Sequence, residues 1–469
     1  MANFNSWAKT SVTLKLVFIG FIIVLLLIPT LLVDDLIRER RNLRDEAQDE
    51  IAGKFGREQT FGGPVISVPY TYTQSTPGAN GPVITSKSGY AHFLPEELEI
   101  DGDLTPEERS RGIFVAVLYN TRFTVRGHFN GFNSAALAIP EDALRWEDAI
   151  FTVGISDMRG VDADIDLTLA DTTYSLGPGP ITTDVFESGA NTPVRLAGNE
   201  KRVEFSFALN LNGSSGLYFR PFGARTDVTL RSSWPDPSFG GGFLPQDSEV
   251  TPDGFVVNWE ILQLNRNYPQ QGAGKYLPKV RSYVNRGYDF DNDNGDQDSD
   301  RFGVRLLLPV DEYSKIYRST NYAVLFIIIT FLTFFFIEVL NRRRVHPIQY
   351  ILIGAAIILF YVLLLSISEH KYFDFAYGIS ALAITGLITM YSYGVLRNVK
   401  LTALVAAELI ILYIFFYSLL QLQDYALLIG SLGLLLILGT IMFLTRNIDW
   451  YNLTAADVEE EARPRVPGE

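Results

Sequence analysis

The 469-residue sequence contains no cysteine. This absence excludes disulfide bonds, thiol catalysis and cysteine-ligated zinc. Histidine is scarce, with four residues, and no HExxH, GxSxG or P-loop motif occurs. The sequence also has fewer basic than acidic residues, which gives a formal net charge of −14. Such a charge repels phosphate and other anions. The composition therefore argues against a nucleic-acid partner, acidic substrates and anionic polymers, and it offers no motif for an enzyme.

What the sequence does have is long hydrophobic runs, at its beginning and in its last third. About 20 apolar residues in a helix cross roughly 30 Å of hydrocarbon. Residues 14–33 reach this length, and no small-x-small cleavage site follows them, so we interpret them as a retained anchor helix. Five further spans are predicted at 322–340, 349–368, 373–396, 401–420 and 425–444. Their short connections predict an up-down bundle of five helices.

Basic residues in the short loops predict the orientation of these spans. Three arginines lie together at 342–344, and Arg397 and Lys400 lie in the next loop but one. Short loops rich in arginine and lysine stay in the cytoplasm. We therefore predict cytoplasmic tails at 1–13 and 445–469, and a large domain in the periplasm. The arginines at 38–44 oppose this orientation, but acidic residues are interleaved with them, and large domains are translocated largely regardless of charge.

The predicted periplasmic part begins with a helical stalk over 34–56, where apolar residues recur at helical spacing. We interpret the stalk as a spacer, with a signalling or oligomerising helix as the alternative. From 57 to 320 the period changes to two, in segments bounded by Gly, Pro, Asn and Asp. This predicts an all-β, sandwich or barrel-like domain, with a helical turn at 106–111. The predicted fold class is an α+β membrane protein with an N-terminal anchor helix, a large periplasmic all-β domain and a C-terminal five-helix transmembrane bundle.

Three ionisable residues are weak candidates for catalysis in the predicted bundle. Glu408 lies eight residues into the span 401–420, where a carboxylate is costly and normally faces a partner inside the bundle. It is either a working group or a structural hydrogen-bonding residue. Glu369 and His370 end the span 349–368 and form a candidate acid/base pair, although an interfacial polar ending explains them more simply. Glu338 is interpreted as a snorkelling residue at the interface.

The acidic run DFDNDNGDQDSD at 289–300 offers alternating carboxylates and a glycine, as calcium loops do. It departs from the EF-hand pattern, because the glycine comes one place late and no glutamate closes the loop. A solvated loop is the alternative interpretation. No other cofactor is predicted. The candidate calcium ligands are Asp289, Asp291, Asp293, Asp296 and Asp298.

The stretch SSWPDPSFGGGFLP at 232–245 combines fixed prolines, permissive glycines and aromatic anchors, which predicts a rigid loop. This stretch resembles the CreD family of bacterial inner-membrane proteins. HPIQYILIG at 346–354, LSISEH at 365–370, TRNIDWY at 445–451, GPVISVP at 63–69 and the six-span plan carry the same resemblance. It extends from the anchor to about residue 451, whereas the acidic run and the tail after 452 depart from it. The resemblance implies a role in cell envelope integrity and no established catalytic residues.

Two functions remain open on the sequence alone. The first is a non-enzymatic envelope protein, whose periplasmic β domain binds or senses an unknown periplasmic protein, membrane protein or envelope component. The lipid bilayer is then its other partner. The second is a membrane-embedded enzyme or transporter that acts on an envelope precursor, with Glu408 and the pair Glu369/His370 as its working groups.

Overall fold

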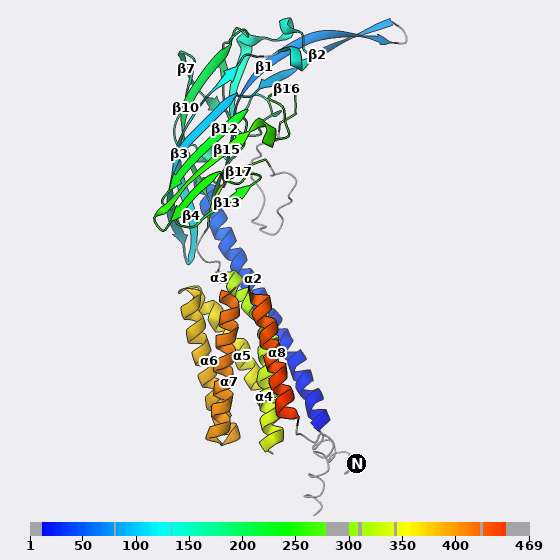
Figure 1. The fold of residues 1–469 in the computed structure, drawn as a ribbon, viewed down its shortest axis with the longest axis vertical. Helices are drawn as coiled ribbons and strands as arrows, with labels where there is room; N and C mark the ends of the chain where they lie inside the picture. Colours follow the sequence, from blue (N-terminus) through cyan, green and yellow to red (C-terminus); the bar gives the residue numbers. More distant parts are fainter. Residues whose placement is uncertain are drawn as a thin grey trace, which may run out of the picture. The chain divides into compact units, whose positions relative to one another are not determined.

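The computed structural model describes residues 12–78, 81–132, 134–277, 300–307, 312–341, 345–422 and 425–446. The chain divides into two compact units. We call Met1–Asn42 with Val310–Glu469 the membrane unit, and Leu43–Pro309 the β unit. Figure 1 shows helices in the first and strands in the second.

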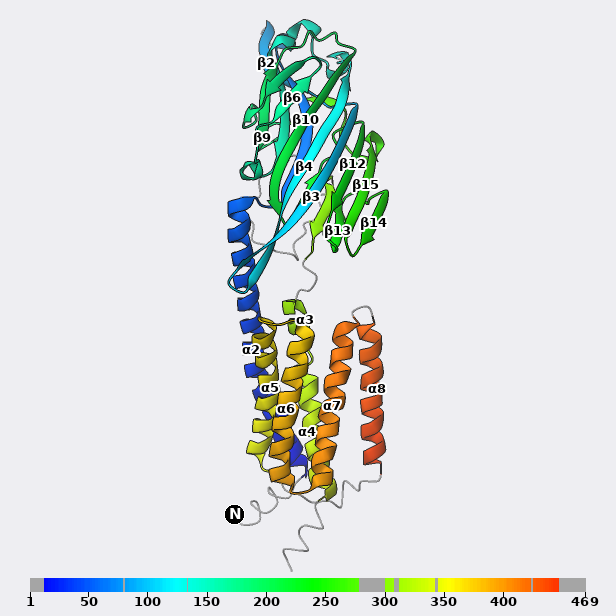
Figure 2. The ribbon, with the colours of Figure 1, turned by 90° about the vertical axis from the view of Figure 1, so that its left-hand side faces the viewer.

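The β unit is a sandwich of two sheets (Figures 1 and 2). Sheet A has the strand order β13-β17-β11-β1-β5-β9-β8, with β2 paired to β1 and β16 to β2; sheet B has the order β14-β15-β12-β3-β4-β10-β6-β7. Sheet A contains β1 (Gln59–Gly78), β2 (Gly81–Phe93), β5 (Ala149–Ile155), β8 (Gly177–Pro178), β9 (Gly189–Val194), β11 (Gly216–Phe219), β13 (Pro237–Gly241), β16 (Gln271–Ala273) and β17 (Phe302–Leu306). Sheet B contains β3 (Glu97–Arg111), β4 (Phe114–Asn130), β6 (Asp166–Leu169), β7 (Thr172–Ser175), β10 (Arg202–Ser214), β12 (Arg225–Ser232), β14 (Asp247–Thr251) and β15 (Gly254–Leu262).

One hydrophobic core joins the two sheets. Along β10, exposed and buried residues alternate from the first residue onward, because one face of sheet B meets sheet A and the other meets water. Phe61 on β1 packs edge-on against Phe123 on β4, with ring centroids 5.4 Å apart. Trp259 on β15 lies 5.5 Å from Phe302 on β17 by the same measure. Large aromatic side chains therefore fill the space between the sheets.

The predicted helical turn at 106–111 is wrong. These residues continue β3 and pair with β4 as far as Arg111↔Phe114. Proline is usually excluded from the middle of a sheet because it lacks an N–H group. Strand β12 pairs with β3 only up to Leu104, so Pro106 lies where one side of the strand is open. A proline is tolerated at such an edge position.

Helix α2 (Val12–Phe55) is continuous over the predicted anchor and stalk. The boundary between the two units falls within it, after Asn42. Gly56 ends the helix with a φ of +143°, and its N–H donates to the Ala52 carbonyl over 2.8 Å. A Cβ atom at position 56 would lie 2.6 Å from the backbone oxygen of Asn212. The helix end therefore requires a glycine.

The membrane unit contains α2 up to Asn42 and six further helices. Residues 312–320 fell inside the predicted β domain but form a helix of this unit, because Tyr313 and Ile316 recur at helical spacing and are buried. Within the described ranges, six helices are long and apolar enough to cross a membrane: α2, α4, α5, α6, α7 and α8. The last five begin and end within two residues of the predicted spans. The bounds are α3 (Glu312–Thr320), α4 (Ala323–Asn341), α5 (Pro347–Ser368), α6 (Phe373–Leu396), α7 (Val399–Gln421) and α8 (Ala426–Thr445).

These features confirm the predicted fold class. An apolar N-terminal helix precedes a central all-β region with two sheets, and helices with several candidate membrane spans follow it. The figures show the same order along the colour gradient, from the blue α2 to the red α8 (Figures 1 and 2).

Candidate functional site

Glu408 lies on α7 and contacts α4. The Thr330 hydroxyl donates a hydrogen bond to its Oε1 atom over 3.4 Å. Its Oε2 atom is buried and has no hydrogen-bond partner among the described residues. Tyr413, also on α7, is buried too, and its hydroxyl has no partner in the same part of the chain. Among the described residues, the Glu408 side chain thus has one long hydrogen bond and one buried oxygen without a partner.

Glu369 and His370, the candidate acid/base pair, have different partners in the structure. Glu369 Oε1 lies 3.6 Å from Nε of Arg40 on α2. His370 Nδ1 lies 3.2 Å from the carbonyl oxygen of Ser366, one turn back on its own helix. Within the described residues, no hydrogen bond or ion pair joins these two side chains to each other or to Glu408.

Glu338 was predicted to be a snorkelling residue at the interface. The structure shows instead that it is buried. Its side chain is 6% exposed, and Lys15 Nζ on α2 lies 2.8 Å from Oε1. The carboxylate also accepts hydrogen bonds from the Val345 N–H over 3.3 Å and from the Tyr350 hydroxyl over 3.4 Å. A snorkelling carboxylate extends to the interface, whereas here the lysine extends inward to the carboxylate. The ion pair fastens α2 to α4 and α5. Lys15 at the mouth of the first span was the only sequence signal for this cluster.

The five candidate calcium ligands at 289–298 lie outside the described residues. Among the residues that are described, no group of three or more His, Asp or Glu is placed to hold a metal ion.

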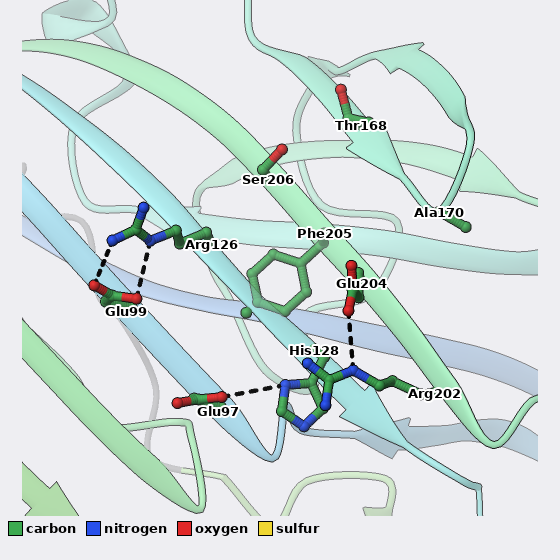
Figure 3. Close-up of a pocket in the computed structure, with 11 residues that line it drawn as sticks. Glu97, Glu99, Arg126, His128, Thr168, Ala170, Arg202, Glu204, Phe205 and Ser206 are labelled. Carbon is green, nitrogen blue, oxygen red and sulfur yellow. Dashed lines mark hydrogen bonds and ion pairs between the residues drawn. The ribbon is translucent and has the colours of Figure 1, made fainter.

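The outer face of sheet B has a hollow of about 390 Å³ (Figure 3). Arg126 donates from Nη2 and Nε to the two carboxylate oxygens of Glu99 over 2.6 and 2.9 Å, and these bonds hold the pKa of Glu99 below its usual value. His128 Nδ1 lies 3.4 Å from Glu97. Arg202 is paired with Glu204 in the same way, over 3.0 Å. Because these charges satisfy one another, the hollow is a polar surface without an activated nucleophile. Its other lining residues are Gly127, Thr168, Ala170, Phe205 and Ser206.

A Ser–His–Asp series lies at sheet A, where Ser67 on β1 and His92 on β2 are buried and the partly exposed Asp184 comes from a turn before β9. Ser67 Oγ is 2.8 Å from His92 Nδ1, and His92 Nε2 is 3.7 Å from Asp184 Oδ2. Burial lowers the pKa of His92 to about 4, so the imidazole is neutral. These three residue types also make up the triad of many hydrolases. However, Ser67 is 2% exposed and His92 fully buried, so no substrate reaches the hydroxyl. The series has a structural role.

The hairpin of β1 and β2 leaves the rest of the β unit as an arm (Figure 1). Eight cross-strand pairs, from Thr71↔Ser88 to Gly78↔Gly81, form it. We call residues 71–78 and 81–88 the arm. Within the described residues, these two segments pair with no strand except each other. Most of the described side chains are exposed, and Ile84 is 73% exposed.

The arm has little in its own structure to stabilise it. A two-stranded hairpin is marginally stable in water when nothing packs on it, and its outer edges present backbone N–H and C=O groups to solvent. Charged residues usually protect such edges, but Lys87 is the only charged residue in the arm. The arm is therefore suited to contact with another chain.

A β sandwich combined with six helices that can span a bilayer defines the class of the protein: a multi-pass membrane protein with one folded β domain. The family model described as Inner membrane protein CreD matches residues 11–451. The Inner membrane protein CreD of Escherichia coli (strain K12) is 32% identical over 433 residues, which cover 92% of this chain and 91% of that protein.

The chain therefore belongs to the CreD family, and the resemblance predicted from the sequence is confirmed. It is a multi-pass protein of the inner membrane, and hence of the cell envelope. The name of its relative states a location and no enzymatic activity.

Proposed function

We propose that this protein supports the integrity of the bacterial cell envelope by binding an envelope protein through the arm, without catalysis. The β unit then lies in the periplasm, and both termini lie in the cytoplasm. The arginines at 342–344 and the basic residues Arg397 and Lys400 support this orientation, because such residues favour cytoplasmic loops.

The exposed edges of the arm carry the proposal. The edges of a two-stranded hairpin carry backbone N–H and C=O groups, and an extended protein segment matches such groups by adding a strand. The arm has one charge, on Lys87, and its other residues are uncharged, so it offers little to bind a charged headgroup or a sugar acid. The partner it fits best is an extended segment of another envelope protein.

Proline and alanine substitutions in the arm separate backbone from side-chain recognition. Consecutive N–H groups point to opposite edges of a strand. Proline at Thr73 and proline at Gln74 therefore remove donors from opposite edges, one facing the partner and one facing β2. Alanine at the same positions removes the side chains and keeps both donors. In cells that lack the wild-type protein, we expect both proline variants to lose protection against detergent and β-lactam stress, and both alanine variants to keep it.

Crosslinking gives a second, direct measurement. A photo-crosslinking amino acid at Ser86 in the arm should yield an adduct with a protein in native membranes, whereas one at Thr173 on the exposed strand β7 should not. A chain in which 71–88 is replaced by a two-residue turn should fold but fail to protect cells. Full protection by that shortened chain would rule out the arm as the functional surface.

A second candidate function is transport of an envelope precursor, or chemistry on it, within the membrane unit. The unpartnered Oε2 atom of Glu408 favours it. Glu408→Gln keeps the size of the side chain and its contact with Thr330 but removes the ionisable group. Loss of envelope protection by a normally folded Glu408→Gln protein would support this second function, and full protection would exclude it. The same assay on Glu369→Gln and His370→Gln tests the remaining predicted residues.

A further inference from the structure

Arg266 is a buried cation of the β unit without an acidic partner in the described part of the chain. It is 6% exposed. Its Nη2 atom donates a hydrogen bond to Gln270 Oε1, and its guanidinium carbon lies 4.4 Å from the ring centroid of Tyr268. The Nε and Nη1 atoms are buried and have no hydrogen-bond partner among the described residues. Two N–H-bearing atoms of one guanidinium therefore face no acceptor there.

A second buried guanidinium lies in the same neighbourhood. Arg220 is 4% exposed. The Tyr268 hydroxyl donates to the carbonyl of Pro221 over 2.9 Å. Pro221 directly follows Arg220 in the sequence, so Tyr268 lies close to Arg220. The charges of Arg220 and Arg266 both act on the Tyr268 hydroxyl. Tyr276, whose hydroxyl donates to the His92 carbonyl over 3.2 Å, is also within range of the Arg266 charge. Two cations and two tyrosines thus lie in one small region, and the charge of Asp300 also acts on the Tyr268 hydroxyl.

The energetics of this region favour an anion. A buried charge costs several kcal/mol unless it is paired and hydrogen-bonded, and a guanidinium stays protonated in proteins. Burial lowers the pKa of Arg266 from its usual value, and the only opposing effects on it come from tyrosines. The Tyr268 ring and the Gln270 amide offset part of the cost. Water could accept hydrogen bonds from Nε and Nη1 but would not neutralise the charge, whereas an oxyanion does both.

We propose that Arg266, with Arg220 beside it, binds one carboxylate or phosphate group. This inference does not depend on the arm or on the membrane unit. The net charge of −14 disfavours anions at long range, but salt screens such repulsion beyond about 8–10 Å. A buried guanidinium acts at contact distance, so the composition does not exclude a local anion site.

Thermal unfolding of the full-length protein in detergent tests the proposal. Tryptophan fluorescence is followed while inorganic phosphate or acetate replaces chloride at constant ionic strength. We expect a saturable rise in Tm of about 3–5 °C for the anion that binds. Arg266→Gln should lose this rise. Arg126→Gln removes an exposed arginine from the hollow on sheet B and should keep it.

Calorimetric titration of the wild-type protein with phosphate and with acetate measures binding directly, without the Arg266→Gln variant. Circular dichroism checks that this variant is folded. A saturable heat for either anion, together with the loss of the Tm rise in Arg266→Gln, supports the site. The proposal is overturned if the wild-type protein shows neither a saturable heat nor a Tm rise beyond that in chloride. It is also overturned if Arg266→Gln responds as the wild type does.

Discussion

Replacing Phe61 by alanine should destabilise the β unit by about 3–5 kcal/mol. Phe61 is 1% exposed, and its ring centroid lies 5.4 Å from that of Phe123 and 6.4 Å from those of Phe207 and Phe219. These neighbours belong to both sheets, and paired strands hold them in place. They cannot collapse into the space left by the ring without shifting a sheet. We therefore expect the loss of stability to fall in the upper half of this range. Such a loss is a large share of the roughly 5–15 kcal/mol of unfolding free energy that is typical for a folded domain.

Unfolding of the full-length protein in detergent gives the measurement, because Trp146, Trp234 and Trp259 lie in the β unit. At about 2–4 °C per kcal/mol for a domain near this size, Tm should fall by about 6–20 °C. Phe61→Leu keeps most of the volume and should cost about 1 kcal/mol. Phe243→Ala removes a half-buried ring and should cost less than Phe61→Ala. Equal losses for the two alanine variants would refute the reasoning that Phe61 joins the two sheets.

Three further predictions concern other positions. Gly154→Ala places a Cβ atom against a phenylalanine ring and should cost about 1–3 kcal/mol of stability in denaturant titrations. Gly240→Ala is the control and should be close to neutral, because no atom lies within 4 Å of its Cβ. Lys15→Met leaves the buried carboxylate of Glu338 without its cation and should lower the resistance of the membrane unit to SDS by about 1–3 kcal/mol; Lys15→Arg should largely retain it. Burial lowers the pKa of His92 to about 4, against 6.5 in an unfolded chain, so the unfolded state binds a proton first as pH falls. The β unit should therefore lose up to about 3 kcal/mol between pH 6.5 and 4, and an equally steep loss in His92→Gln would contradict this assignment.

The sequence was sufficient to predict the long helices because membrane spanning depends on one local property, the length of an apolar run. Phe373–Leu396 forms the helix at the predicted residues. The helix Glu312–Thr320 was not predicted, since nine mainly polar residues at the end of a β-rich region carry no comparable signal. Its buried residues are recognisable only once the neighbouring helices are in place.

Long-range pairing limited the prediction of the sites. Lys15 and Glu338 are 323 residues apart, and no periodicity links them, so Glu338 was assigned to the interface by its position alone. Glu369 and His370 are adjacent in sequence, but the structure gives them different partners, Arg40 and the Ser366 carbonyl. The parallel pairing of β3 with β12 and the length of the arm also depend on distant strands. Alternation identifies a strand but not its neighbours.

Strand β1 continues as one element of 20 residues from the middle of sheet A into the arm. Tension applied to the arm along this strand passes directly to 59–67, where β1 pairs first with β11 and then with β5. The hydrogen bonds of a sheet run across the strands, so such a pull loads them in shear, all at once, instead of opening them one by one. A force applied at the arm would thus be resisted by the core of the β domain and not by the hairpin alone.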